Sequence, residues 1–216
     1  MTNSLQGKKG LVVGIANDQS IAWGCARALR DAGVELALTW FNDKARPHVE
    51  PLAQKLQAAI TLPLDVEQPG QMEAVFDAIA QRWGQLDFVL HSIAFAPKSD
   101  LHGRVADSSR EGFARAMDIS CHSFARMAHL AEPLMPRGGS LMTMSYVGAE
   151  EVIPGYGLMG PVKAALLGSR TGPQGHPCQC HLARPAGHAR GLGHPRFRYA
   201  VARGCAARTA APSGGH

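Results

Sequence analysis

Short apolar runs rich in β-branched residues alternate with helical patterns along the first 167 residues of the chain. The runs predict five strands, at 9–16, 34–40, 59–64, 86–93 and 140–145. Apolar residues at helical spacing predict helices between them, at 20–33, 46–56, 69–83 and 108–135. Strands that alternate with such helices need right-handed crossovers, which build a parallel sheet covered on both faces. We therefore expect an α/β fold with a doubly wound parallel sheet of the Rossmann type.

Charge divides the chain at the same point. Residues 1–167 carry 15 Lys and Arg against 17 Asp and Glu, whereas residues 168–216 carry seven Arg and no Lys, Asp or Glu. The formal net charge of +5 therefore comes entirely from the C-terminal segment. This segment lacks the periodic apolar residues that pack a helix or strand on a core. We expect one incomplete domain over 1–167 and a disordered basic tail over 168–216, with the strand at 140–145 left as a bare edge.

Several classes of protein do not fit the sequence. No apolar run approaches the length of a bilayer span and the N-terminus does not resemble a signal peptide, so a cytoplasmic location is expected. Cys25 and Cys121 fall within helical patterns as small buried thiols, which predicts no disulfide framework. The segment Cys178-Gln179-Cys180-His181 matches no common zinc spacing, so no metal is expected.

The first candidate site lies between the first strand and the first helix. Gly14 permits close backbone approach, and Ser20 with the free amides that open the helix can hold a pyrophosphate. An ordinary strand-to-helix turn with a Ser N-cap would look the same, so this loop alone leaves both interpretations open. After the second strand, residues 40–43 contain no Arg or Lys for a 2′-phosphate, although Lys44 is close. This absence favours NADH over NADPH.

The second candidate site follows the fifth strand and contains Tyr146, Tyr156 and Lys163. Tyr156 and Lys163 are seven residues apart, so they share one face if the segment is helical. A neighbouring ammonium favours the ionised form of a phenol, which suits a group that stabilises a developing oxyanion. A Tyr and a Lys on a partly exposed helix can also simply pack and be solvated, and the pair alone does not decide between the two.

Taken together, these motifs resemble the NADH-dependent enoyl-acyl-carrier-protein reductases, a divergent branch of the short-chain dehydrogenase/reductases. The resemblance runs from about residue 7 to residue 165. The seven-residue spacing from Tyr156 to Lys163, with Tyr146 before it, is typical of this branch, whereas most of the superfamily spaces the pair four apart. Other matching segments are Asn42-Asp43-Lys44, Asp65-Val66, His91 to Pro97, Arg110 to Phe113 and Asp118-Ile119-Ser120.

The resemblance implies a role for each matching residue. The residues that would line NADH are Gly14, Ser20, Ile21, Phe41, Asp65, Val66, Ile93 and Lys163. Ala96 would lie beside the acyl substrate, and Tyr146, Tyr156 and Lys163 would form the catalytic group. The implied reaction is reduction of the trans-2 double bond of an enoyl thioester on acyl carrier protein, in fatty acid elongation. Intact members are expected to form homotetramers, and the incomplete C-terminal part argues against this assembly here.

The chain departs from the family at three positions. Phe41 stands where many members have Gln, Ala94 where they usually have Gly, and Gly157 where Asn commonly follows the catalytic Tyr. Phe41 could stack beside the adenine. Gly157 is expected to loosen the start of the catalytic helix by about 1 kcal/mol.

The resemblance stops at about Leu166, and the tail suggests a reason. Synonymous codons for Pro173 to Pro195, read one base later, can encode PKGIRVNAISPGPLATRAASGI, which resembles the family's next strand and its Ser-Pro-Gly-Pro turn. We therefore interpret the tail as an out-of-frame translation and expect the C-terminal strands to be missing or replaced. This chain would then have little or no activity.

Two alternatives remain at this point. Another short-chain reductase, such as one that acts on 3-oxoacyl groups, would share the fold, but the seven-residue spacing and Tyr146 argue against it. A non-catalytic protein could bind nucleic acid through the basic tail. Only Phe197 and Tyr199 could stack on bases there, so no nucleic-acid partner is expected.

Overall fold

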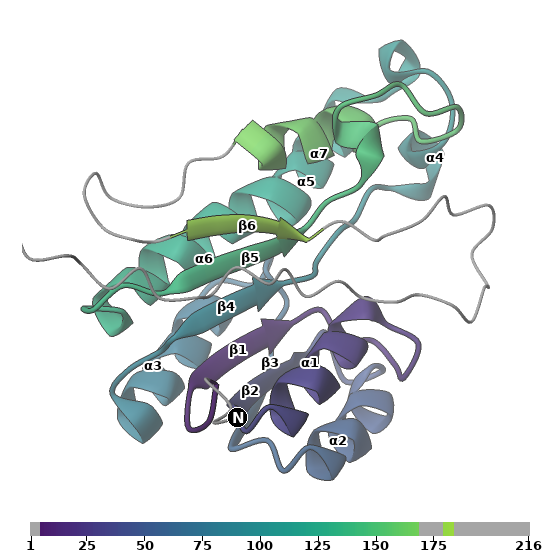
Figure 1. The fold of residues 1–216 in the computed structure, drawn as a ribbon. Helices are drawn as coiled ribbons and strands as arrows, with labels where there is room; N and C mark the ends of the chain where they lie inside the picture. Colours follow the sequence, from purple (N-terminus) through teal and green to yellow (C-terminus); the bar gives the residue numbers. More distant parts are fainter. Residues whose placement is uncertain (1–4, 169–178, 184–216) are drawn as a thin grey trace, which may run out of the picture.

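The computed structural model describes residues 5–168 and 179–183. These residues form a six-stranded sheet in the order β3-β2-β1-β4-β5-β6, and every neighbouring pair is parallel (Figure 1). This order is that of the doubly wound dinucleotide-binding fold, with the change of direction between β1 and β4. The predicted fold class is confirmed.

The strands and helices lie within two or three residues of most of the predicted bounds. The strands are β1 (Lys9–Val13), β2 (Glu35–Trp40), β3 (Ile60–Pro63), β4 (Phe88–His91), β5 (Ser140–Met144) and β6 (Gln179–Ala183). The helices between them are α1 (Ile21–Asp31), α2 (Arg46–Lys55), α3 (Gln71–Trp83), α4 (Lys98–Leu101), α5 (Arg110–Met117), α6 (Ser123–Ala131) and α7 (Met159–Gly168). Single 3₁₀ turns are η1 (Val105–Asp107), η3 (Glu132–Leu134) and η4 (Val147–Ala149).

Two apolar clusters hold the helices on opposite faces of the sheet. One cluster packs α3 and α6 on the sheet through residues such as Val89, Phe124 and Met127. The other packs α1 and α2 on the opposite face through Leu38, Val49 and Leu52. Strand residues alternate between the two clusters because successive side chains of a strand point to opposite faces. Because helices cover both faces, the central strands are apolar on both sides.

The long helix predicted at 108–135 is interrupted. A π-helical turn, η2 (Asp118–His122), separates α5 from α6. The helix also starts later than the predicted residue 108, because the N-cap is Ser109, whose Oγ accepts a hydrogen bond from Gly112 N–H at 2.9 Å. The Ser109 N–H donates to the carboxylate of Asp100, which places Ser109 at the start of the helix. The local pattern could not show this choice, since Asp100 comes from another element.

The prediction of a bare edge at β5 was wrong. Residues Gln179–Ala183 form β6 and pair with β5 in parallel, from Ser140 opposite Gln179 to Met144 opposite Ala183. An unpaired edge offers backbone N–H and C=O groups to any extended segment, whatever its side chains. A segment of the C-terminal part thus occupies the edge beside β5, and the predicted disorder of the remaining tail residues lies outside the described residues.

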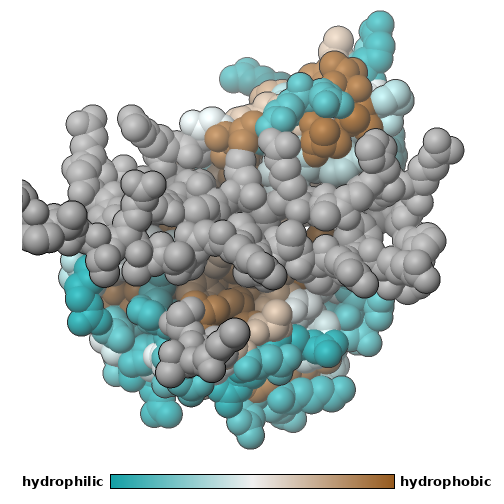
Figure 2. Space-filling model, in the orientation of Figure 1, coloured by the Kyte–Doolittle hydropathy of each residue, from teal (hydrophilic) through white to brown (hydrophobic). Residues whose placement is uncertain are grey.

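One face of the molecule leaves apolar surface in view. On the side of α1, Figure 2 shows brown surface over the sheet beside that helix. Met142 and Met144 of β5 are half-buried and pack against the cluster that holds α1 and α2, while Leu141 on the opposite face is buried. Apolar side chains also gather near η4 and the segment that leads to α7, where Val152 is 99% exposed.

Two features are absent from the described part of the chain, a membrane-spanning helix and a group of metal-ligating side chains. None of its helices is long and apolar enough to cross a membrane. No group of three or more metal-ligating side chains occurs among the same residues. Cys25 and Cys121 are buried, as predicted, while the Cys178-Gln179-Cys180-His181 segment begins outside the described residues.

Candidate active site

The loops that follow β1 and β4 touch each other through their backbones. Gly14 has a φ of +95°, and a Cβ there would lie 2.1 Å from the carbonyl oxygen of Ser92. The N–H of Ser92 donates to the carbonyl of Val13 at 3.1 Å, which fixes the two loops side by side. The close approach expected at Gly14 is therefore an approach to the neighbouring loop, and only glycine fits both the dihedral angle and the space.

Ser20 stands at the N-cap of α1 but makes no side-chain cap to the helix. Its hydroxyl instead accepts weakly from the N–H groups of Ala16 and Asn17, both at 3.4 Å, and donates to the carbonyl of Asn17. The hydroxyl thus shapes the loop. Because the Ser20 side chain makes no hydrogen bond to the backbone N–H groups at the start of α1, it does not block them from a ligand. Those amides and the positive end of the helix dipole are the groups that can hold a pyrophosphate.

Three further candidates follow β2 and β3 at the same edge of the sheet. Phe41 comes directly after β2 and is 55% exposed, so its ring is free to stack on a planar ligand. Asp65 follows β3; its N–H donates to Gln71 Oε1 at 2.8 Å, and its Oδ1 accepts from the N–H of Glu67 at 3.0 Å. These two bonds hold the turn in which Val66 is buried.

The loop after β4 is attached to the π-helical turn. Ser120 Oγ accepts a hydrogen bond from the N–H of Phe95 at 2.8 Å and donates to the carbonyl of the same residue at 3.0 Å. The guanidinium of Arg115 lies 4.8 Å from the centroid of the Phe95 ring. Ile93 and Ala96, the cofactor and substrate candidates of this loop, are half-buried on either side of this anchor.

Tyr146 and Tyr156 pack ring against ring after β5. Their centroids are 4.8 Å apart and the rings are inclined at 54°. Gly148 makes this contact possible, because a Cβ at that position would lie 2.4 Å from Cδ1 of Tyr156. Burial and the neighbouring Tyr146 raise the pKa of Tyr156 to about 12. The phenol of Tyr156 is therefore protonated at neutral pH and can donate a hydrogen bond or a proton.

Lys163 is buried on α7, with a relative exposure of 5%. Its Nζ donates to the carbonyl of Met144, the last residue of β5, at 2.8 Å. Burial lowers the pKa of Lys163 to about 8. The ammonium is thus charged at neutral pH and lies at the carboxyl end of β5.

The expected helical relation between Tyr156 and Lys163 is not found. Helix α7 begins only at Met159, and the glycines on both sides of Tyr156 have positive φ angles, +78° at Gly155 and +48° at Gly157. Left-handed residues cannot continue a right-handed helix, so Tyr156 lies in the turn before α7. The expected lowering of the Tyr156 pKa is likewise wrong, because desolvation raises this pKa and Lys163 Nζ is bound to Met144.

Three residues that support the site were not predicted from the sequence: His91, Ser120 and Gly148. Ser120 and His91 lie in segments that matched the family but received no role, and Gly148 received none at all. A buried polar residue at the end of a predicted apolar strand, as at His91, was an available signal. The contacts of Ser120 and Gly148 depend on distant residues, so the sequence offered no local sign of them.

A parallel sheet of this order with a Tyr and a Lys at its carboxyl edge is typical of the short-chain dehydrogenase/reductase class. Within this class, the family model described as enoyl-(acyl carrier protein) reductase matches residues 14–171. The chain belongs to the enoyl-(acyl carrier protein) reductase family.

Curated relatives agree with this family. The chain is 50% identical over 165 residues to enoyl-[acyl-carrier-protein] reductase [NADH] 1 of Rhizobium meliloti, which covers 76% of this chain and 61% of the relative. It is 45% identical over 168 residues to the corresponding NADH reductase of Rickettsia conorii, which covers 78% of this chain and 65% of the relative. The chain therefore spans less than two thirds of the length of each of these two relatives.

Solved structures show the same relationship. The reductase of Anaplasma phagocytophilum in complex with NAD superimposes with a TM-score of 0.73 at 47% identity, over 75% of this chain and 62% of that one. The Bacillus cereus reductase, solved with NADP⁺ and an indole naphthyridinone, has a TM-score of 0.73 at 41% identity, over 75% of this chain and 64% of that one. Similar folds thus carry either dinucleotide.

Proposed function

We propose that this chain carries the cofactor-binding and catalytic part of an NADH-dependent enoyl-acyl-carrier-protein reductase. The observation that supports this proposal is the convergence of Tyr146, Tyr156 and Lys163 with the ends of β1 to β5 at one edge of the sheet. The substrate would be a trans-2-enoyl thioester on acyl carrier protein, and the reaction a step of fatty acid elongation.

The cofactor candidates are suited to NADH. The amides that open α1 would hold the pyrophosphate, and Gly14 and Ser20 would shape the loop that carries it. Phe41 would stack on the adenine, and the remaining residues around the dinucleotide would be Ile21, Asp65, Val66 and Ile93. When bound, NADH supplies the hydride for C3 of the enoyl group.

The roles of the catalytic group follow from its protonation. Tyr156, with a pKa of about 12, keeps its proton and can donate a hydrogen bond to the enolate oxygen that develops on the thioester. Lys163, charged at neutral pH, would hold the hydroxyls of the cofactor ribose. Tyr146 packs on Tyr156 and would shape the acyl pocket, with Ala96 on its other side. Protonation at C2 completes the reduction.

The C-terminal part limits what this chain can do. We propose that residues 168–216 are an out-of-frame translation, that the acyl-binding part of the family is missing, and that the homotetramer of intact members does not form. Sequencing the gene across codons 160–180 tests this directly: a confirmed primary frame that encodes the tail would refute it. A cytoplasmic location stays a prediction from the family.

Activity is best tested in a frame-restored gene, with one base removed ahead of the codon for Pro173, beside the chain as it stands. We expect the restored protein to reduce a trans-2-enoyl thioester with NADH and the present chain to show little turnover. Tyr156→Phe in the restored protein should slow turnover on the order of a hundredfold or more and leave NADH binding unchanged. Unchanged turnover would contradict the role of Tyr156, and preference for a 3-oxoacyl thioester would favour the alternative reductase.

A further inference from the structure

His91 is a fully buried polar residue at the carboxyl end of β4, with a relative exposure of 0%. It pairs across the sheet with Val13 of β1 and Thr143 of β5. The preceding residues on the same face, such as Val89 and Leu141, belong to an apolar cluster. If these positions served only to pack the core, apolar residues would be expected at 91 and 143 as well. The polar pair of His91 and Thr143 therefore indicates a function other than packing at the ends of the two strands.

Two hydrogen bonds hold the His91 ring. Its Nε2 lies 2.8 Å from Ser123 Oγ, and its Nδ1 lies 3.1 Å from Thr143 Oγ1. Ser123 Oγ also donates to the carbonyl of Ile119 at 2.6 Å. A hydroxyl has one proton, so Ser123 must accept from Nε2–H, and a neutral ring then accepts from Thr143 at Nδ1. Burial, with a contribution from the charge of Lys163, lowers the pKa of His91 to about 3 and keeps the ring neutral.

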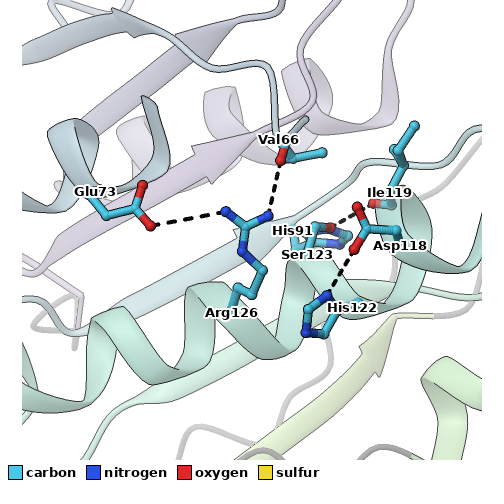
Figure 3. A network of polar contacts seen from close by, with 8 residues as sticks. All are labelled: Val66, Glu73, His91, Asp118, Ile119, His122, Ser123 and Arg126. Carbon is cyan, nitrogen blue, oxygen red and sulfur yellow. Dashed lines mark hydrogen bonds and ion pairs between the residues drawn. The ribbon is translucent and has the colours of Figure 1, made fainter. Parts of the chain in front are cut away.

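These hydrogen bonds join three parts of the fold. Thr143 of β5 binds His91 of β4, and His91 binds Ser123, the first residue of α6 after the π-helical turn. Figure 3 shows Ser123 between His91 and Ile119, with the side chain of Arg126 one turn further along α6. Arg126 donates to the carbonyl of Val66 at 3.0 Å. The same helix therefore fixes the end of β4 through His91 and the end of β3 through Val66.

The residues immediately after His91 connect this arrangement to the candidate cofactor site. Ser92 donates its N–H to Val13 and places its carbonyl against Gly14, at the centre of that site. Any rotation of the His91 backbone would move Ser92 and Ile93 directly.

We propose that His91, fixed as the Nε2–H tautomer by Thr143 and Ser123, is a positioning residue that holds the Ser92–Ile93 backbone for the dinucleotide. This inference rests on the proposed function only for the identity of the ligand, because the position of the backbone can be measured without one.

The test uses the full chain and two substitutions of one residue. Thr143→Val removes the hydroxyl that donates to His91 and keeps the volume, whereas Thr143→Ser keeps the hydroxyl. Thr61→Val, on the edge strand β3, is a control for the loss of a hydroxyl from the sheet. Two properties are measured well below the unfolding temperature: hydrogen exchange of the Ser92 amide without ligand, and the Kd for NADH.

A positioning role predicts that Thr143→Val speeds exchange of the Ser92 amide and raises the Kd for NADH about fivefold, the usual effect of one lost hydrogen bond. Thr143→Ser should restore both, and Thr61→Val should change neither. In ¹⁵N-histidine spectra of the unsubstituted chain, His91 should be protonated at Nε2.

Other outcomes separate the two proposals. If Thr143→Val lowers only the unfolding temperature and leaves Ser92 exchange unchanged, His91 is a core residue and the inference is overturned. Protonation at Nδ1 would overturn it as well. If no variant binds NADH while Ser92 exchange responds as predicted, the positioning role stands and the proposed function fails.

Discussion

Gly14→Ala tests the contact on which the candidate site is built. The new Cβ would lie 2.1 Å from the carbonyl oxygen of Ser92 and 2.6 Å from its carbonyl carbon, both backbone atoms that cannot rotate away. A φ of +95° costs a residue with a Cβ about 1 kcal/mol, and relief of the overlap costs about 2 kcal/mol more as the two loops separate. We expect the free energy of unfolding of the full chain to fall by about 3 kcal/mol.

Gly70→Ala is the matched control for this substitution. Gly70 also has a positive φ, +82°, but a Cβ there meets nothing within 4 Å. Only the dihedral cost remains, so the loss should be about 1 kcal/mol. Urea unfolding of both variants measures the difference. Equal losses would show that the contact between Gly14 and Ser92 is not tight, and the argument for a fixed β1–β4 junction would fail.

Three further predictions concern the buried groups of the site. Gly148→Ala should displace the Tyr156 ring, since its Cβ would lie 2.4 Å from that ring, and should change the near-ultraviolet circular dichroism of the tyrosines; Gly160→Ala, whose Cβ would lie 3.4 Å from the nearest atom, should not. Because burial lowers the pKa of Lys163 to about 8, the unfolded chain holds this proton longer, so stability should rise by about 3 kcal/mol from pH 8 to 10.5. Urea unfolding against pH should lose this rise in Lys163→Met. The His91 pKa of about 3 predicts the same sign in acid: stability falls as the pH drops from 6.5 towards 3, and His91→Asn should reduce that fall.

The first five strands and the helices between them could be predicted from the sequence because their signals are local, and their alternation predicted the doubly wound class of fold. Each strand is a short apolar run with a turn at its end, and each helix between them has apolar residues at a spacing of three or four. The edge of the sheet that carries the candidate cofactor site could also be predicted, since parallel strands bring their carboxyl ends together at one edge.

Features set by distant contacts were not predicted. Ser109 rather than Ser108 caps α5 because Asp100 binds its N–H. The π-helical turn brings Ser120 to the Phe95 backbone, and helix periodicity carries no sign of such an insertion. Tyr156 leaves the helix because two flanking glycines adopt left-handed angles, a conformation that glycine permits but does not require.

The pairing of β6 with β5 was unexpected for a different reason. The composition of the tail argued against a strand, and this argument considered side chains alone. Pairing at a sheet edge is made by backbone groups, which Gln179–Ala183 supply as well as any other segment.

We propose that the edge formed by the ends of β1 to β5 holds NADH in the chain as it stands. A fluorescence titration of the full chain with NADH, which follows energy transfer from tryptophan to the nicotinamide, tests this most directly. The account predicts saturable binding that Gly70→Ala leaves intact and Gly14→Ala weakens. No saturable binding by the full chain would contradict it.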